Sequence, residues 1–162
     1  MKLNRLFFQN KDYILEGDID FSSYEFDPYH IRKIGLTHVK ITGSIFEDLL
    51  MLNFHIISDV IGVCAYTLED VPIHLDFKES LEISNEVEDD DTIFFEKNPI
   101  FDIDPYVLSL VVSEVPAKIV KKGAELPEDG SGYRVLSEDE YEQEQANKKD
   151  PRWSALDDID LD

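Results

Sequence analysis

Apolar and polar residues alternate along residues 71–83, where the odd positions are apolar except for Glu79. This period of two predicts a strand with one face in a core and the other face in water. Residues 49–57 are apolar on both faces, which is typical of a central strand covered on both sides. Turn-forming residues gather near the end of residues 64–70, between these two strands. The stretch from residue 36 to residue 83 therefore predicts an antiparallel sheet.

Shorter patterns extend this sheet on both sides. Residues 38–45 alternate well, and Gly43 within them marks a bulge or a close approach of two backbones. The Glu47–Asp48 pair that follows is expected to form a turn. The apolar island at residues 93–95 is expected to be a strand that closes the sheet.

The N-terminal region carries weaker patterns, two of which leave alternatives open. Asn4 is a suitable N-cap for a short helix, although a strand over residues 3–8 fits almost as well. Residues 17–21 predict a strand. The Asp27–Pro28 pair fits either a turn or a one-turn helix that runs through residues 30–32.

One main helix is predicted near residues 104–115. Asp104 is placed to cap it, Pro105 occupies its first turn, and Pro116 is expected to end it. Its valines lower the helix propensity, so packing must stabilise it. A short strand over residues 117–120 is expected to follow.

The composition changes after residue 122. Residues 123–162 hold 13 acidic and four basic residues and few large apolar ones. Ser137 and Glu140 have the spacing of a capping box, which predicts a short helix there. We therefore expect an α+β fold: a mainly antiparallel sheet over residues 1–122, as a meander or a partly closed barrel, followed by an acidic, partly disordered tail.

The charge balance limits the partners that the chain can bind. Its 36 acidic and 15 basic residues give a net charge of −21. Nucleic acid binding relies on Lys and Arg contacts to phosphate, so RNA is expected to need a local basic patch or a basic protein as intermediary. Lys118, Lys121 and Lys122 are the compact basic cluster that the sequence offers to RNA.

The chain carries no pattern of a secreted or membrane protein. The apolar run at its start is too short for a signal peptide, and no stretch is long and apolar enough to span a bilayer. We therefore expect a cytoplasmic protein that does not contact a membrane.

The sequence offers one candidate group of catalytic residues, and each of these residues also has a simpler structural interpretation, which we prefer. Asp102 and Asp104, with the acidic loop at residues 86–91, suggest a metal-dependent hydrolase as the alternative function. Asp104 is better used as a helix cap, and a charge run is most often a solvated loop. Cys64 lies in an apolar run and is expected to be an inert core residue. We expect no enzyme activity, no cofactor and no small-molecule substrate.

The end of the tail differs from the rest of it because it combines a turn-forming pair, an arginine and the single tryptophan of the chain. These are residue types from which binding surfaces are built. A short docking segment is therefore predicted at residues 150–156, with the following residues as candidate partner contacts: Asp150, Pro151, Arg152, Trp153 and Leu156.

Four stretches of the chain resemble motifs of the YceD family, in particular its YlbN-like members. The stretch Cys64-Ala65-Tyr66-Thr67-Leu68 resembles the family's C-x-R-x-L region, with Tyr66 in place of the arginine. Residues 101–107 and 114–116 resemble its I-D-L-x-P-Y-I and L-P segments. Residues 130–140 and 150–156 resemble its S-G-x-G-W-x-V-L-T-E-E-E and D-P-R-L-A-x-L stretches. The family-motif positions in this chain are Cys64, Tyr66, Leu68, Asp102, Pro105 and Pro116, of which Tyr66 departs from the motif.

The resemblance implies a non-enzymatic cytoplasmic protein linked to the accumulation of large-subunit ribosomal RNA. It would act as an accessory factor in ribosome biogenesis by binding a partner, which we expect to be a basic ribosomal or assembly protein and, as an alternative, ribosomal RNA. Many relatives carry further cysteines near the C-terminus that resemble zinc ligands. This chain has one cysteine, so no zinc site is carried over.

Overall fold

The computed structural model describes residues 1–10, 13–86 and 92–147. The chain divides into two units, Met1–Lys121 and Lys122–Asp162, and each is described by itself. The assignment of the last part of the chain as a separate tail stays a prediction.

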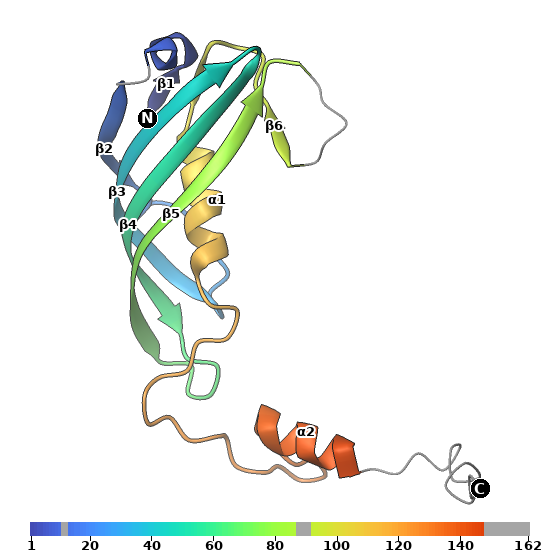
Figure 1. Cartoon of the computed structure of the whole chain (residues 1–162). Coiled ribbons are helices and arrows are strands. Elements are labelled where there is room, and N and C mark those ends of the chain that lie inside the picture. The colour runs from blue at the N-terminus through green and yellow to red at the C-terminus, as the bar shows by residue number, and fades with distance from the viewer. Residues whose placement is uncertain (11–12, 87–91, 148–162) are drawn as a thin grey trace, which may run out of the picture. The chain divides into compact units, whose positions relative to one another are not determined.

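The first unit is built on a five-stranded sheet with the strand order β2-β3-β4-β5-β6 (Figure 1). The strands are β2 (Ile14–Asp20), β3 (Ile31–Phe46), β4 (Leu49–Val63), β5 (Asp70–Ser84) and β6 (Ile93–Phe95). Neighbouring strands from β2 to β5 pair antiparallel, as predicted, and the sheet curls into a half-barrel. β6 joins β5 in parallel over three residue pairs, so the predicted strand is present with the opposite direction of pairing. The predicted α+β class is confirmed.

The N-terminus combines both alternatives left open by the sequence. A short strand β1 (Lys2–Asn4) pairs with β7 (Ile100–Asp102), and a 3₁₀ helix, η1 (Arg5–Gln9), follows directly. The side chain of Asn4 accepts a hydrogen bond from the amide of Leu6 at 3.0 Å, so the predicted cap is confirmed.

β3 begins earlier than its alternation suggests. The chain turns at Asp27, whose side chain accepts a hydrogen bond from the amide of Tyr29 at 3.0 Å, and the strand starts at Ile31. The pairing with β4 shifts register between Ile31 and Lys33 and again between Ile34 and Thr37. These shifts interrupt the period of two, which explains why the first part of the strand is hidden in the sequence. Of the two alternatives at Asp27–Pro28, the turn is the one that forms.

Gly43 is a point of close backbone approach. A Cβ atom at this position would lie 2.4 Å from the carbonyl oxygen of Met51 on the paired strand and 3.0 Å from the side chain of Leu52. β3 and β4 can therefore pair here at this distance only with glycine.

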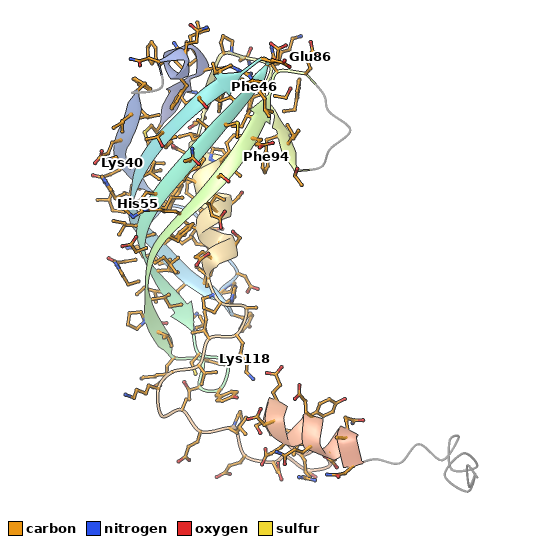
Figure 2. All side chains as sticks on the ribbon, in the orientation of Figure 1. Lys40, Phe46, His55, Glu86, Phe94 and Lys118 are labelled. Atoms are coloured by element: carbon orange, nitrogen blue, oxygen red, sulfur yellow. The ribbon has the colours of Figure 1, made fainter. Side chains whose placement is uncertain are left out.

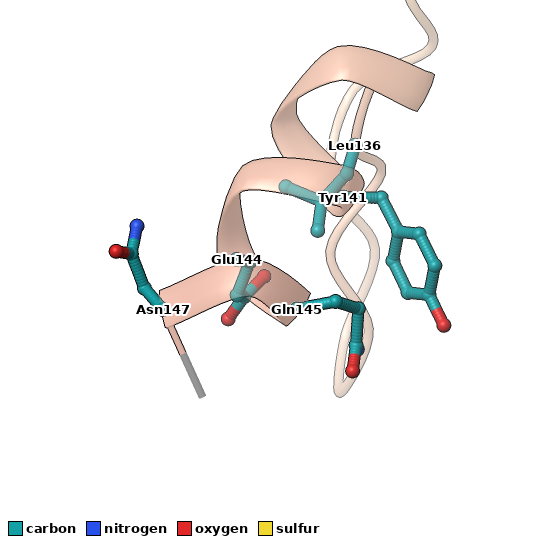
Figure 3. A pocket seen from close by; sticks show the side chains of 5 residues that line it. All are labelled: Leu136, Tyr141, Glu144, Gln145 and Asn147. Carbon is teal, nitrogen blue, oxygen red and sulfur yellow. The ribbon is translucent and has the colours of Figure 1, made fainter. Parts of the chain in front are cut away.

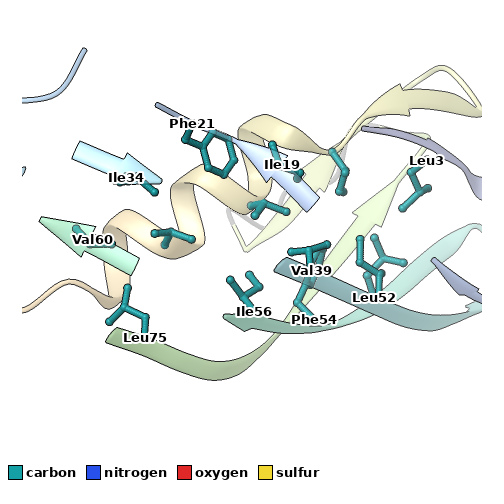
Figure 4. Close-up of a cluster of buried hydrophobic side chains, with 14 of the residues drawn as sticks. Leu3, Ile19, Phe21, Ile34, Val39, Leu52, Phe54, Ile56, Val60 and Leu75 are labelled. Atoms are coloured by element: carbon teal, nitrogen blue, oxygen red, sulfur yellow. The ribbon is translucent and has the colours of Figure 1, made fainter. Parts of the chain in front are cut away.

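The main helix, α1 (Asp104–Glu114), lies against the buried face of the sheet (Figures 1 and 4). Val107 and Val111 are fully buried in the same core as the inward residues of the strands. The prediction that Asp104 caps the helix is wrong: the N-cap is Ile103, which makes no side-chain cap bond. Asp104 is instead the first helical residue, and its carboxylate accepts a hydrogen bond from the Met1 amine.

The segment after the helix is not the short strand that the sequence predicts. Residues 117–120 have no strand pairing, although Ile119 is buried and its carbonyl accepts a hydrogen bond from the amide of Ala65 at 2.7 Å. The burial of Ile119 explains why residues 117–120 resemble a strand in the sequence. One buried apolar residue between exposed neighbours gives the same short apolar–polar pattern as a strand.

The second unit contains one described helix, α2 (Glu138–Asn147), which buries no residue. Ser137 Oγ accepts a hydrogen bond from the amide of Glu140 at 3.2 Å, and the Glu140 carboxylate accepts one from the amide of Ser137 at 2.8 Å. The predicted capping box is confirmed. Across both units, none of the described helices has the length and apolarity to cross a membrane.

Candidate functional site

The turn between β4 and β5, residues 64–69, gathers three of the motif positions that the sequence singled out. It closes through hydrogen bonds from the amide of Cys64 to the carbonyl of Glu69 and from the amide of Leu68 to the carbonyl of Cys64, both at 2.9 Å. Leu68 takes a left-handed conformation with φ of 59°, which is unusual for a residue with a branched side chain. Cys64 and Leu68 are therefore positioned by the geometry of one tight turn.

The segment that follows α1 crosses this turn and is anchored on Cys64. The amide of Lys121 donates a hydrogen bond to Cys64 Sγ at 3.3 Å, and the thiol is completely shielded from solvent. Hydrogen bonding by Lys121, with a contribution from Thr67, lowers the pKa of Cys64 to about 7. Burial of the cysteine is confirmed. The lowered pKa was not foreseen, because the sequence could not indicate an amide donor 57 residues away.

Two of the three lysines of the predicted basic cluster meet the same turn. Lys118 Nζ lies 5.4 Å from the centroid of the Tyr66 ring, a cation–π contact. Lys121 Nζ donates to Glu69 at 3.0 Å, which lowers the pKa of that carboxyl group. The family motif has arginine at the position of Tyr66. In this chain the ammonium group of Lys118 brings a positive charge close to that position. Lys122 begins the second unit, and its predicted contact with RNA, like those of Lys118 and Lys121, stays a prediction.

Residues around the start of β3 hold both the turn and the segment that follows α1. His30 Nε2 donates a hydrogen bond to the carbonyl of Pro116 at 2.9 Å. Arg32 donates to the carboxylate of Asp70 at 3.1 Å and to the carbonyl of Leu68 at 3.2 Å. The sequence did not assign either residue to this site: Arg32 lies at the first register shift, which hides the start of the strand, and His30 directly precedes the strand.

Asp102 and Pro105 lie at the N-terminal end of α1, which starts at Asp104. The Met1 amine donates to Asp104 and, at 3.3 Å, to Asp102, which also accepts a hydrogen bond from the amide of Asp104 at 3.2 Å. Burial acts to raise the pKa of Asp102, but the hydrogen bonds from Asp104 and Met1 outweigh it and lower the pKa. The two carboxylates proposed for a hydrolase thus hold the amino terminus.

The other parts of the hydrolase hypothesis, a metal ion and the acidic loop, stay untested predictions. Within the ranges that the structure describes, no group of three His, Cys, Asp or Glu side chains could hold a metal ion. Residues 87–91 of the acidic loop lie outside the described residues, as does the predicted docking segment at 150–156 with Asp150, Pro151, Arg152, Trp153 and Leu156.

His55 and His74 lie on neighbouring strands but do not face each other: His55 lies opposite Lys78 and His74 lies opposite Asp59. Each is bonded to an aspartate: His55 to Asp76 and His74 to Asp59, both at 2.8 Å.

A hollow of about 590 Å³ in the second unit lies along α2 (Figure 3). Its lining residues are Leu136, Tyr141, Glu144, Gln145 and Asn147. Glu144 is the single carboxylate among them, so the hollow has no pair of acid–base groups.

Comparison with known proteins identifies the family. Residues 52–160 match the family described as "Large ribosomal RNA subunit accumulation protein YceD", a range that begins in β4 and includes the turn at Cys64 and both helices. The curled β-sheet protein with this anchored turn belongs to the YceD family.

One relative resembles the chain over most of its length. It is described as "Uncharacterized protein YlbN" from Bacillus subtilis (strain 168), and it is 30% identical over 135 residues, which are 78% of this chain and 75% of the relative. No solved structure matches the chain.

Proposed function

We propose that the chain is a non-enzymatic accessory factor in ribosome biogenesis, which binds a basic ribosomal or assembly protein. The description of its family as large ribosomal RNA subunit accumulation proteins supports the role in ribosome biogenesis. In a bacterium such a factor acts in the cytoplasm. The more specific part of the proposal, that the chain binds a basic protein, rests on the net negative charge of the chain.

The observation behind the basic partner is the excess of carboxylates, 36 against 15 basic side chains. α2 concentrates it, because the helix carries five acidic residues and no basic one, and buries none of its side chains. Arg134, the basic residue that approaches the helix, lies 3.9 Å from Glu144. A surface of this kind attracts a positively charged protein and repels RNA phosphates.

The proposal excludes catalysis as the main activity. Asp102 and Asp104 are engaged by the Met1 amine, and a general acid or base must be able to reach a substrate. Metal analysis and a hydrolysis assay on the purified protein would test the alternative. A bound metal ion together with an activity that Asp104→Asn removes without unfolding would support the hydrolase.

The docking segment is proposed to complete the binding of the partner. Tagged full-length protein should capture large-subunit ribosomal proteins from a bacterial lysate, with and without RNase, and removal of residues 150–162 should weaken capture without changing the melting temperature. Trp153→Ala should reproduce most of that loss. Tyr133→Ala is the matched control, since Tyr133 is an exposed aromatic residue of the second unit outside the docking segment.

The result also separates the ways in which the proposal can fail. A truncated protein that melts several degrees lower shows that the segment belongs to the fold. Unchanged stability together with unchanged capture rejects the docking segment. Capture that disappears on RNase treatment rejects a direct protein partner in favour of RNA.

A further inference from the structure

Three basic side chains form a row across the outer face of the sheet. Lys40 on β3 pairs with His55 on β4, and His55 pairs with Lys78 on β5. The residues on either side of Lys40 and His55 in their strands are buried, so these two side chains project from the face opposite α1 (Figure 2). Directly paired residues lie about 5 Å apart at their Cβ atoms. The row is a second basic group, which the sequence reasoning missed when it considered the three lysines at 118–122.

The row combines paired and unpaired charge. Glu16 lies opposite Lys40 on β2, 3.7 Å from its ammonium group, and Asp76 lies 2.8 Å from His55. Lys78 makes no ion pair within the described ranges of the chain. Its ammonium group is therefore available to bind an anion.

A hollow beside the row offers further polar contacts. It has a volume of about 340 Å³, and its lining includes Lys40, Lys78 and the polar side chains of Thr42 and Asn53. This combination suits a phosphate that is linked to a sugar. The hydroxyl of Thr42 and the amide of Asn53 can form hydrogen bonds with sugar hydroxyls, while the lysine ammonium groups bind the charged phosphate.

Exposed aromatic residues lie further along the same face. Phe46 pairs with Leu49, Leu49 pairs with Ser84, and Ser84 pairs with Phe95, so the four residues form another row at the β3–β4 turn. The side chains of Phe46 and Phe95 are 68% and 48% exposed. Phe46 lies six positions along β3 from Lys40, which is roughly 20 Å at 3.3 Å per residue.

We propose that this outer face, from the Lys40–His55–Lys78 row to Phe46 and Phe95, binds a short segment of single-stranded RNA. Cationic groups that follow the backbone and aromatic rings that stack on bases are the two elements of single-strand recognition. Thr42 and Asn53 are placed to bond 2′-hydroxyl groups, which distinguish RNA from DNA. The inference goes beyond the proposed protein partner and does not depend on it.

The test is binding of a fluorescent single-stranded RNA of about ten nucleotides to the full chain at low salt, followed by fluorescence anisotropy. The double variant Lys40→Gln/Lys78→Gln should bind at least about tenfold more weakly. It should also reduce the slope of log affinity against log salt by about 1.4, since each lost phosphate contact contributes about 0.7. Lys40→Arg/Lys78→Arg should retain binding.

Lys2→Gln/Lys97→Gln is the matched control, because it removes the same charge from two exposed lysines that lie outside the five-stranded sheet. It should leave the affinity within about twofold, while Phe46→Ser should weaken binding by about fivefold or more through loss of stacking. Circular dichroism checks that each variant is folded.

Three outcomes overturn the inference: no binding by the unmodified protein, equal losses in the two lysine pairs, or a loss confined to the control pair. Equal binding of a duplex of the same sequence overturns the single-stranded assignment. Capture of a basic protein by the Lys40→Gln/Lys78→Gln variant, measured in parallel, reports on the proposed function separately.

Discussion

Cys64 is held by a contact that is distant in sequence. It is fully buried, and its sulfur accepts the Lys121 amide that anchors the segment after α1. A hydroxyl group is smaller and more costly to bury than a thiol.

We predict that Cys64→Ser lowers the free energy of unfolding by about 1–3 kcal/mol, as measured by urea denaturation. In the unmodified protein, a thiol reagent should label Cys64 much more slowly in buffer than in urea. Native labelling at the rate of a model peptide would contradict the burial.

His38 provides a prediction about pH. Its ring bonds to Asp18 at 2.8 Å and lies 3.3 Å from Glu16; hydrogen bonding to Asp18 and, more weakly, to Glu16 raises the pKa of His38. Because the folded-state pKa is raised, the stabilisation is fully present below the unfolded value of about 6.5 and is lost as the pH rises through the folded-state value.

NMR titration should therefore give His38 a pKa above that of a model peptide. The difference in melting temperature between the unmodified protein and His38→Gln should be larger at low pH than at high pH. A titration at or below the model value would show that the carboxylates do not hold the imidazolium.

At the scale of elements, Gly43 and Gly35 on β3 form a natural comparison. A Cβ at Gly43 would lie 2.4 Å from the carbonyl of Met51, whereas one at Gly35 would lie at an ordinary 3.6 Å from the carbonyl of Asp59.

Gly43→Ala is predicted to destabilise the protein by about 1–3 kcal/mol through overpacking, while Gly35→Ala should change stability by less than about 0.5 kcal/mol. Chemical denaturation of both variants measures the difference. Similar effects of the two substitutions would show that the β3–β4 distance adapts.

Helices and strands were predictable from the sequence where a short local pattern is enough to determine them. The alternation at residues 71–83 and the Ser137–Glu140 spacing both gave elements that form. The start of β3 and the segment at 117–120 were not predictable, because register shifts and a long-range anchor decide them.

The basic row was only half accessible from the sequence. A two-residue turn at Glu47–Asp48 places Lys40 opposite His55, and that turn was predicted. Lys78 joins the row through the register of β4 with β5, which depends on the six-residue turn and the left-handed Leu68. The turn site itself required the long-range contact between Lys121 and Cys64.

At the scale of the whole molecule, the net charge of −21 makes the folded chain repel itself. We predict that the melting temperature rises by several degrees as sodium chloride increases from low concentration to about 0.5 M, because the Debye length falls below about 10 Å. Calorimetry with sodium and potassium chloride should give the same rise, as screening does not depend on the cation. A flat or falling melting temperature would show that local ion pairs outweigh the net repulsion.

The pairing of β1 with β7 has a consequence for folding during synthesis. Leu3 lies opposite Phe101 and is entirely buried, whereas β3, β4 and β5 are joined by short turns. Local pairings form quickly, and pairings between distant residues form slowly. On a translating ribosome the β3–β4–β5 meander can assemble as it emerges, but the first residues must wait for residue 101 before they reach their place. We therefore expect the amino terminus to dock last, when most of the first unit has already left the exit tunnel.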